Sequence, residues 1–164
     1  MFESLSDKLQ DTLKRLRGEA KLTESNIADA MQDIRKADLL GKPTIISVVP
    51  SLDTPVCQVQ TKKFNESLGS LGDKINALTV SLDLPFAMKR FCGAESITAM
   101  KVGSDYKDRE FGKAYGLLID ELKILARAVY ILDAKGHVVY GELVKEVASE
   151  PNYDAAMAAL EKLV

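Results

Sequence analysis

The stretch in which a β-branched run gives way to a helix start constrains the fold of this chain most. The apolar run Thr44–Val49 predicts a buried strand that ends at Pro50. Thr54 is a good helix N-cap, and Pro55 suits the first helical position, where its missing N–H costs nothing. The stretch therefore predicts a strand followed directly by a helix, with Cys57 in the first helical turn.

This position gives Cys57 a chemical role. The first turn of a helix has backbone N–H groups without helical partners and carries the positive end of the helix dipole. Both favour a thiolate over a thiol. We therefore expect Cys57 to be a nucleophile at the mouth of an α/β sheet.

Size and charge exclude several classes of protein. A chain of 164 residues is long enough for one domain with a proper core, and a net charge of −2 argues against a nucleic-acid partner. No apolar run approaches membrane-spanning length, and Met1–Ser4 has neither the basic flank nor the apolar stretch of a signal peptide. We expect a cytoplasmic protein without a nucleic-acid or membrane partner.

The reactive residue types are few. The two cysteines, Cys57 and Cys92, are too few for a disulfide scaffold or a structural zinc site. They do not form a Cys-x-x-Cys pair, so a thioredoxin-type dithiol is not expected. The one histidine, His137, enters a predicted strand and is expected to be solvated, which argues against Cys-His and Ser-His-Asp hydrolases.

Hydrophobic periodicity beyond residue 38 predicts an α/β domain with parallel and antiparallel strands. A thioredoxin-like sandwich of three layers fits this order. The segment 97–102 is predicted as extended or short helical. The other predicted elements are strands at 44–49, 75–80, 124–132 and 137–143, and helices at 55–68, 85–91, 109–115 and 153–163.

Several separated motifs point to one family. They are Gly41–Cys57, Asp83–Ala87, Arg90–Glu95, Ser104–Asp105, Phe111–Gly112, Ala114–Gly116, Leu125–Val129 and Glu150–Tyr153. Across these motifs, from about Leu39 to Val164, the chain resembles the thiol peroxidase group of atypical two-cysteine peroxiredoxins. The resemblance implies an enzyme that reduces hydroperoxides and needs no cofactor.

The resemblance also implies a role for each site residue. Cys57 would be the peroxidatic cysteine, which attacks the peroxide and becomes a sulfenic acid. Thr54 would hydrogen-bond the peroxide and the thiolate, Pro50 would shield the pocket from water, and Arg127 would hold the thiolate and polarise the O–O bond. Cys92 would be the resolving cysteine, and thioredoxin would reduce the resulting disulfide.

The residues themselves leave alternatives open. Arg127 interrupts an apolar run, so it is either a buried cation with a partner or an arginine on the wet face of a hairpin. Thr54 could merely cap a helix, Pro50 could merely end a strand, and Cys92 could be a small buried hydrophobe. If the Cα atoms of Cys57 and Cys92 are more than about 7 Å apart, a helical turn must unwind before they can bond.

The front of the chain has a different pattern. Apolar residues recur at helical spacing, and the motifs Met1–Gln10, Leu16–Gly18, Leu22–Ile27 and Asp33–Ala37 resemble the start of the N domain of the signal recognition particle GTPase. This resemblance predicts a helical hairpin over residues 1–37 that packs on a core of residues 38–164.

A chimera of two families, joined near Lys36–Leu40, follows from these two resemblances. The hairpin would replace the N-terminal strands of the peroxiredoxin core, and their loss would expose the sheet edge beside Ile75–Val80. A homodimer through that edge is one consequence. The alternative function is an engineered chimeric scaffold that keeps the site residues with little or no activity.

Overall fold

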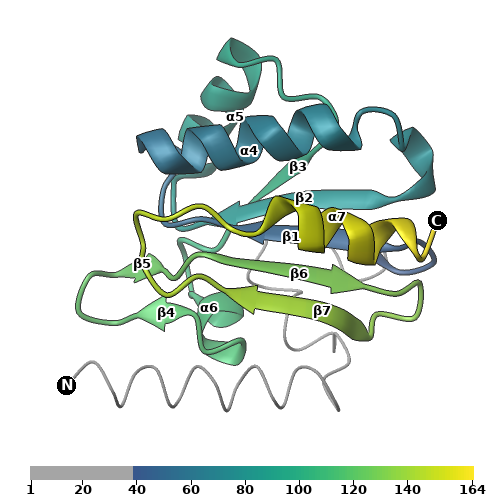
Figure 1. Ribbon diagram of the computed structural model, residues 1–164. Coiled ribbons are helices and arrows are strands. Elements are labelled where there is room, and N and C mark those ends of the chain that lie inside the picture. Colours follow the sequence, from purple (N-terminus) through teal and green to yellow (C-terminus); the bar gives the residue numbers. More distant parts are fainter. Residues whose placement is uncertain (1–38) are drawn as a thin grey trace.

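The structure is a computed structural model that describes residues 39–164 (Figure 1). A five-stranded sheet runs in the order β3-β2-β1-β6-β7, and a separate two-stranded sheet pairs β4 with β5. The strands are β1 (Thr44–Val48), β2 (Asn76–Ser81), β3 (Lys101–Ser104), β4 (Leu118–Ile119), β5 (Ile124–Leu125), β6 (Ala128–Leu132) and β7 (Val138–Leu143). The helices are α4 (Pro55–Leu68), α5 (Pro85–Ala94), α6 (Glu110–Ala114) and α7 (Tyr153–Glu161), with a 3-10 turn η1 (Gly72–Lys74).

The main sheet is mixed, as predicted. β1 lies at its centre and pairs in parallel with β2 and antiparallel with β6. β2 pairs in parallel with β3, and β6 pairs antiparallel with β7. Every residue of β1 is buried, which explains why apolar and polar residues do not alternate along this strand.

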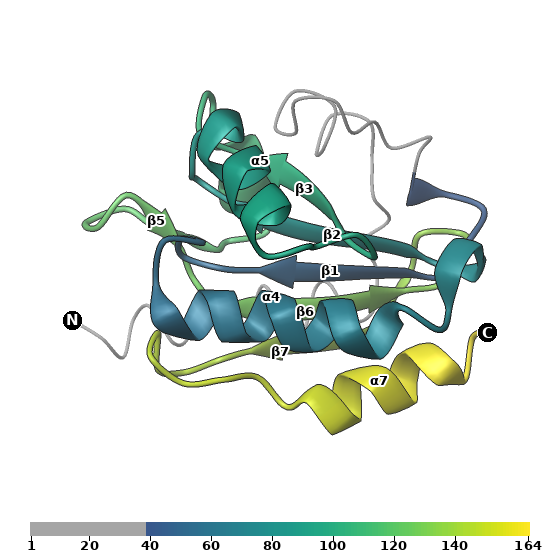
Figure 2. The same cartoon turned by 90° about the horizontal axis from the view of Figure 1, so that it is seen from above.

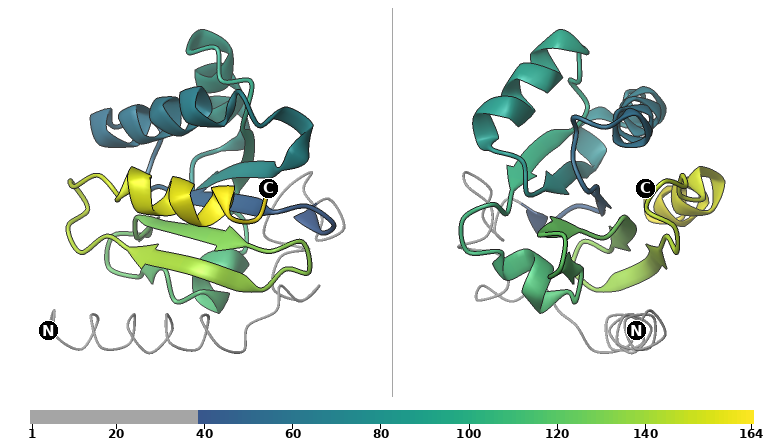
Figure 3. Two further views of the ribbon diagram at one scale, coloured as in Figure 1. Left: turned by 45° about the vertical axis from the view of Figure 1, so that its right-hand side comes forward. Right: turned by 90° about the vertical axis from the view of Figure 1, so that its left-hand side faces the viewer.

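Helices cover both faces of the sheet. α4 and α7 lie side by side over one face, and α6 lies on the other (Figures 1 and 3). Successive residues of β1 point to opposite faces, so Ile45 packs with Phe64 of α4 and Leu160 of α7, whereas Ile46 packs with Phe111 of α6. This arrangement confirms the thioredoxin-like α/β sandwich.

α5 occupies the β3 end of the molecule. Seen from above, it lies beside β3, while α4 begins at the loop that follows β1 and runs back along β1 (Figure 2). Met88 and Phe91 of α5 pack against Val49 and Leu52, which follow β1. The helix that carries Cys92 therefore lies against the segment that leads to Cys57. None of the helices within residues 39–164 is long and apolar enough to cross a membrane.

The prediction of one strand over residues 124–132 is wrong. Ala126 and Arg127 lie between two strands that belong to different sheets, because β5 pairs with β4 and β6 pairs with β1. The Ala126 amide donates to the Leu117 carbonyl, and the Arg127 carbonyl accepts from the Val144 amide. A change of sheet partner, which periodicity does not reveal, places Arg127 at this break.

The predicted open edge beside residues 75–80 is also wrong. β3 pairs with β2 from Leu78↔Lys101 to Ser81↔Ser104, so β2 is an interior strand. The segment predicted as extended or short helical at 97–102 supplies the start of this edge strand. The predicted helical hairpin and its packing on the core lie outside the described residues.

Candidate active site

The junction between β1 and α4 has the predicted geometry at its backbone. Pro55 occupies the first helical turn, and Thr54 is the N-cap residue with extended backbone angles of φ −125° and ψ 145°. The Thr54 side chain, however, does not cap the helix: its Oγ1 donates to the Ser51 carbonyl at 2.8 Å. Cys57 follows in the first turn with 0% of its surface exposed.

Arg127 meets Cys57 inside the protein. Its Nη2 lies 3.4 Å from Cys57 Sγ, and its Nη1 donates to Gln60 Oε1 at 2.6 Å. Nε and Nη2 both donate to the Val147 carbonyl, at 3.2 and 2.7 Å. Arg127 is only 1% exposed, which excludes the wet face of a hairpin and leaves the buried cation with a partner.

The charge of Arg127 is not neutralised by an acid in direct contact. Gln60 and Val147 offer neutral carbonyl oxygens, and within residues 39–164 no carboxylate forms an ion pair with Arg127. A buried guanidinium without a counter-charge is costly. The Arg127 charge contributes to the lowered pKa of Glu150, but Glu150 does not contact Arg127, whereas Cys57 Sγ does.

The sequence did not point to the other partners of Arg127. Gln60 lies three residues after Cys57 and therefore on the same helical face, a signal that was available. Its Nε2 donates to Ser47 Oγ at 2.8 Å, which fixes the amide so that its oxygen faces Arg127. Val147 contributes a backbone carbonyl from the loop between β7 and α7, and no side-chain pattern marks such a role.

This loop is held to α4 by an exposed cluster. Lys63 Nζ lies 2.7 Å from Glu150 Oε2, which also accepts from the Tyr153 hydroxyl. These hydrogen bonds, that of Lys63 foremost, lower the pKa of Glu150. The cluster ties the segment that carries Val147 to the helix that carries Cys57.

Pro50 and Cys92 occupy different surroundings. Pro50 is buried two residues after the end of β1, on the segment that leads into the Cys57 turn. Cys92 lies near the end of α5 as a free thiol, and burial raises its pKa. It packs at the margin of the cluster that contains Phe64, whereas Cys57 packs with Val49, Leu52 and Met88. The structure thus joins Cys57 with Arg127 and leaves Cys92 in a neighbouring cluster.

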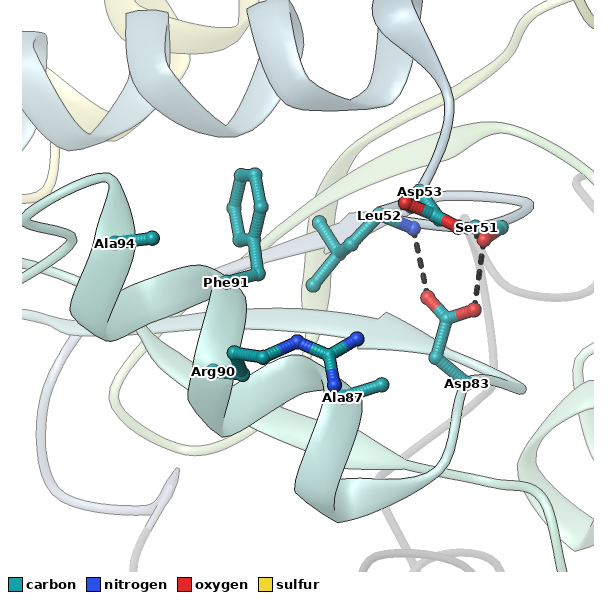
Figure 4. Close-up of a pocket in the computed structure, with 8 residues that line it drawn as sticks. All are labelled: Ser51, Leu52, Asp53, Asp83, Ala87, Arg90, Phe91 and Ala94. Atoms are coloured by element: carbon teal, nitrogen blue, oxygen red, sulfur yellow. Dashed lines mark hydrogen bonds between the residues drawn. The ribbon is translucent and has the colours of Figure 1, made fainter.

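A pocket opens between the loop before α4 and α5. Ser51, Leu52 and Asp53 form one wall, and α5 forms the other with Ala87, Arg90, Phe91 and Ala94 (Figure 4). Asp83 lies at its base and hydrogen-bonds to the loop. Within residues 39–164, no cluster of three His, Cys, Asp or Glu side chains could hold a metal ion.

The fold agrees with the comparisons with known proteins. The profile of the Redoxin family matches residues 10–157, and the chain belongs to this family. Its relatives there include the thiol peroxidase of Bacillus subtilis (strain 168), which is 47% identical over 138 residues, covering 84% of this chain and 82% of that protein.

Solved structures with a similar fold include proteins of the same kind. A peroxiredoxin-like protein from Aquifex aeolicus has a TM-score of 0.71 and 44% identity, covering 76% of this chain and 73% of that one. A thiol peroxidase from Chromobacterium violaceum shares the fold with a TM-score of 0.69 at 18% identity, covering 80% and 77% of the two chains. The family match begins at residue 10 and so extends into residues 1–37, and the comparisons do not show the predicted resemblance of that segment to a GTPase.

Proposed function

We propose that this protein is a thiol-dependent peroxidase that reduces hydroperoxides through Cys57. The observation that carries the proposal is the buried Arg127 guanidinium, whose Nη2 lies 3.4 Å from Cys57 Sγ. A cation fixed by two carbonyl oxygens lowers the free energy of a nearby anion without having to reorganise during the reaction. Family membership and the thiol peroxidase relatives support the same activity.

The first step oxidises sulfur and reduces the peroxide. The Cys57 thiolate attacks the distal peroxide oxygen, the O–O bond breaks, and the alkoxide leaves with a proton as an alcohol or as water. Cys57 becomes a sulfenic acid. In this step Arg127 stabilises the charge as it passes from sulfur to oxygen, while Thr54 hydrogen-bonds the peroxide and Pro50 keeps water from the sulfur.

The second step regenerates the site through Cys92. Its thiol attacks the sulfur of the sulfenic acid, a disulfide forms, and water leaves. A dithiol reductant, for which thioredoxin is our proposal, then reduces this disulfide by exchange. A homodimer remains a prediction, although β3 covers the edge beside residues 75–80 through which it was expected. Sedimentation analysis of the purified chain will decide it.

Peroxide consumption tests the proposal directly. With dithiothreitol and hydrogen peroxide, the protein is expected to turn over, whereas Cys57→Ser is expected to be inactive. Without a reductant, Cys92→Ser is expected to react once and to accumulate sulfenic acid at Cys57. Equal consumption by the protein and by Cys57→Ser would overturn the assignment. Replacing dithiothreitol with thioredoxin and its reductase tests the reductant separately.

The same assay addresses the chimeric scaffold. That alternative predicts a folded protein whose peroxide consumption does not exceed that of Cys57→Ser. Nothing in residues 39–164 favours it, because Cys57 and Arg127 are in contact. Turnover by the full chain would exclude a scaffold without activity.

A further inference from the structure

Asp83 connects the two segments that carry the cysteines. Its Oδ1 accepts from Ser51 Oγ at 2.7 Å, and its Oδ2 accepts from the Leu52 amide at 2.7 Å. Both donors lie in the loop that leads into α4, five and six residues before Cys57. Asp83 itself lies two residues before Pro85, the first residue of α5, which carries Cys92.

Asp83, which precedes α5, is itself hydrogen-bonded to the ends of two strands of the main sheet. Ser81, at the end of β2, donates from Oγ to Asp83 Oδ2 at 2.8 Å and accepts from the Asp83 amide at 3.1 Å. Ser104, at the end of β3, donates from Oγ to the Asp83 carbonyl. Asp83 is therefore held by two strand ends, and its carboxylate reaches from this support to the loop (Figure 4).

The loop has few other attachments near Asp83. Ser51 Oγ accepts from the Asp53 amide at 3.1 Å, and the Ser51 carbonyl accepts from Thr54, but these bonds are internal to the loop. Besides Asp83, the packing of Leu52 on Met88 and Phe91 connects the loop with α5. A partly buried carboxylate that accepts three hydrogen bonds is the strong polar element of this junction.

The proposed disulfide requires the loop before α4 and the helix α5 to move relative to each other. Cys57 has no exposed surface, and Cys92 packs in a neighbouring cluster as a free thiol. The two sulfur atoms must approach to about 2 Å to bond. Opening the first turn of α4 displaces the loop directly before it, and Asp83 holds this loop through its bonds to Ser51 and Leu52.

We propose that Asp83 is a positioning residue that holds the Cys57 loop against α5 and so sets how long the sulfenic acid persists before Cys92 reaches it. This inference rests on the proposed peroxidase function. While the junction is closed, a second peroxide can convert the sulfenic acid to a sulfinic acid, with release of an alcohol or water. When it opens, Cys92 forms the disulfide instead. Asp83 thus controls the ratio of the two products.

A single-turnover experiment measures this ratio. Reduced protein is mixed with increasing hydrogen peroxide and quenched with an alkylating reagent, and mass spectrometry gives the thiol, disulfide and sulfinic acid at Cys57. Asp83→Ala removes both bonds to the loop, so disulfide formation is expected to accelerate by about tenfold, with less sulfinic acid at each peroxide concentration. Asp83→Asn keeps one acceptor oxygen and is expected to give an intermediate rate.

Asp53→Ala is the matched control. It removes the same charge from the same pocket, but Asp53 is exposed and its side chain is not part of the connection. Ser51→Ala removes one of the two bonds between Asp83 and the loop, together with the bond from the Asp53 amide, and provides a milder variant if Asp83→Ala does not fold. Disulfide and sulfinic acid yields of the Asp83 and Ser51 variants equal to those of Asp53→Ala would overturn the proposal. So would a parallel slowing of sulfenic acid formation and disulfide formation, which marks a merely structural role.

A second oxidant separates this proposal from the peroxidase function. Diamide takes two hydrogen atoms from a pair of thiols and forms the Cys57–Cys92 disulfide without peroxide. Asp83→Ala is expected to form this disulfide about tenfold faster than Asp53→Ala, even if neither protein reacts with peroxide. In Asp83→Ala, amide hydrogen exchange is also expected to be faster than in Asp53→Ala, both in residues 54–58 and in residues 87–92. Equal rates with diamide would refute the role of Asp83.

Discussion

Arg127 Nη2 lies 3.4 Å from Cys57 Sγ, although the two residues are 70 positions apart in the chain. Arg127 owes this position to the break between β5 and β6, and Cys57 owes its position to the start of α4. Neither side chain is exposed by more than 1%. The contact therefore pairs a fixed, buried cation with a sulfur atom that lies at the positive end of a helix.

Arg127→Lys tests the geometry of this cation rather than its charge. A lysine ammonium cannot bond Cys57, Gln60 and the Val147 carbonyl at once, because it lacks the planar fork of a guanidinium. The rate constant for peroxide reduction is expected to fall on the order of 100-fold or more. Arg90→Lys, at an exposed arginine of α5, is the control and should keep the rate. An unchanged rate in Arg127→Lys would contradict the role of Arg127.

Cys92 is expected to react slowly with thiol reagents near neutral pH. Burial raises its pKa, and only the thiolate is nucleophilic, so its reactive fraction at a given pH is smaller than that of an exposed cysteine. In the Cys57→Ser variant, alkylation by iodoacetamide should increase with pH and level off only above the ordinary cysteine pKa of about 8.5. Levelling off at or below this value would contradict the prediction. The unfolded variant provides the reference curve.

Gly112→Ala is expected to destabilise the fold. A Cβ atom at this position would lie 2.5 Å from Leu125 Cδ2 and 3.3 Å from Asp105 Oδ2, which accepts from the Gly112 amide. Such overpacking lowers the free energy of unfolding by about 1–3 kcal/mol. Gly93→Ala in α5 is the control, because a Cβ there meets nothing within 4 Å. Urea denaturation should therefore show a loss for Gly112→Ala and a gain of up to about 1 kcal/mol for Gly93→Ala.

Glu150 is expected to stabilise the protein only above its own pKa. Hydrogen bonds from Lys63 and Tyr153 lower that pKa in the folded state, so the stabilisation is complete above the unfolded value of about 4.3 and is lost as the pH falls through the folded value. Because the pair with Lys63 is exposed, Glu150→Gln should cost at most about 1 kcal/mol at neutral pH. The difference in unfolding free energy should vanish on acidification. A difference that grows in acid would contradict the prediction.

Local sequence was sufficient wherever neighbouring residues decide the structure. The helix predicted at 55–68 has the bounds of α4, and Pro55 lies at its start as predicted, although the Thr54 side chain does not cap it. His137 is exposed, as its place after a turn suggested. Gly116 has a φ of +63° and follows Tyr115, the C-cap residue of α6; this conformation favours glycine at a helix end.

Long-range pairing could not be predicted in the same way. Residues 124–132 have the apolar pattern of one strand, yet Leu125 pairs with Leu118 while Ala128 pairs with Val48. The segment 97–102, predicted as extended or short helical, covers only the first two residues of β3, whose pairing with β2 closes the edge predicted to be open. Apolar periodicity reports which residues are buried, but it does not say which strand lies beside which.

The amino-acid sequence alone determined the strand-to-helix junction at Cys57, the α/β class and the residue types of the site, because each depends on neighbours within a turn or a strand. Only the tertiary structure decided that Arg127 is buried against Cys57, that a backbone carbonyl at Val147 holds it, and that Asp83 joins the loop of one cysteine to the helix of the other. These contacts join residues 20 to 70 positions apart, and their geometry exists only once the sheet has brought its strand ends together.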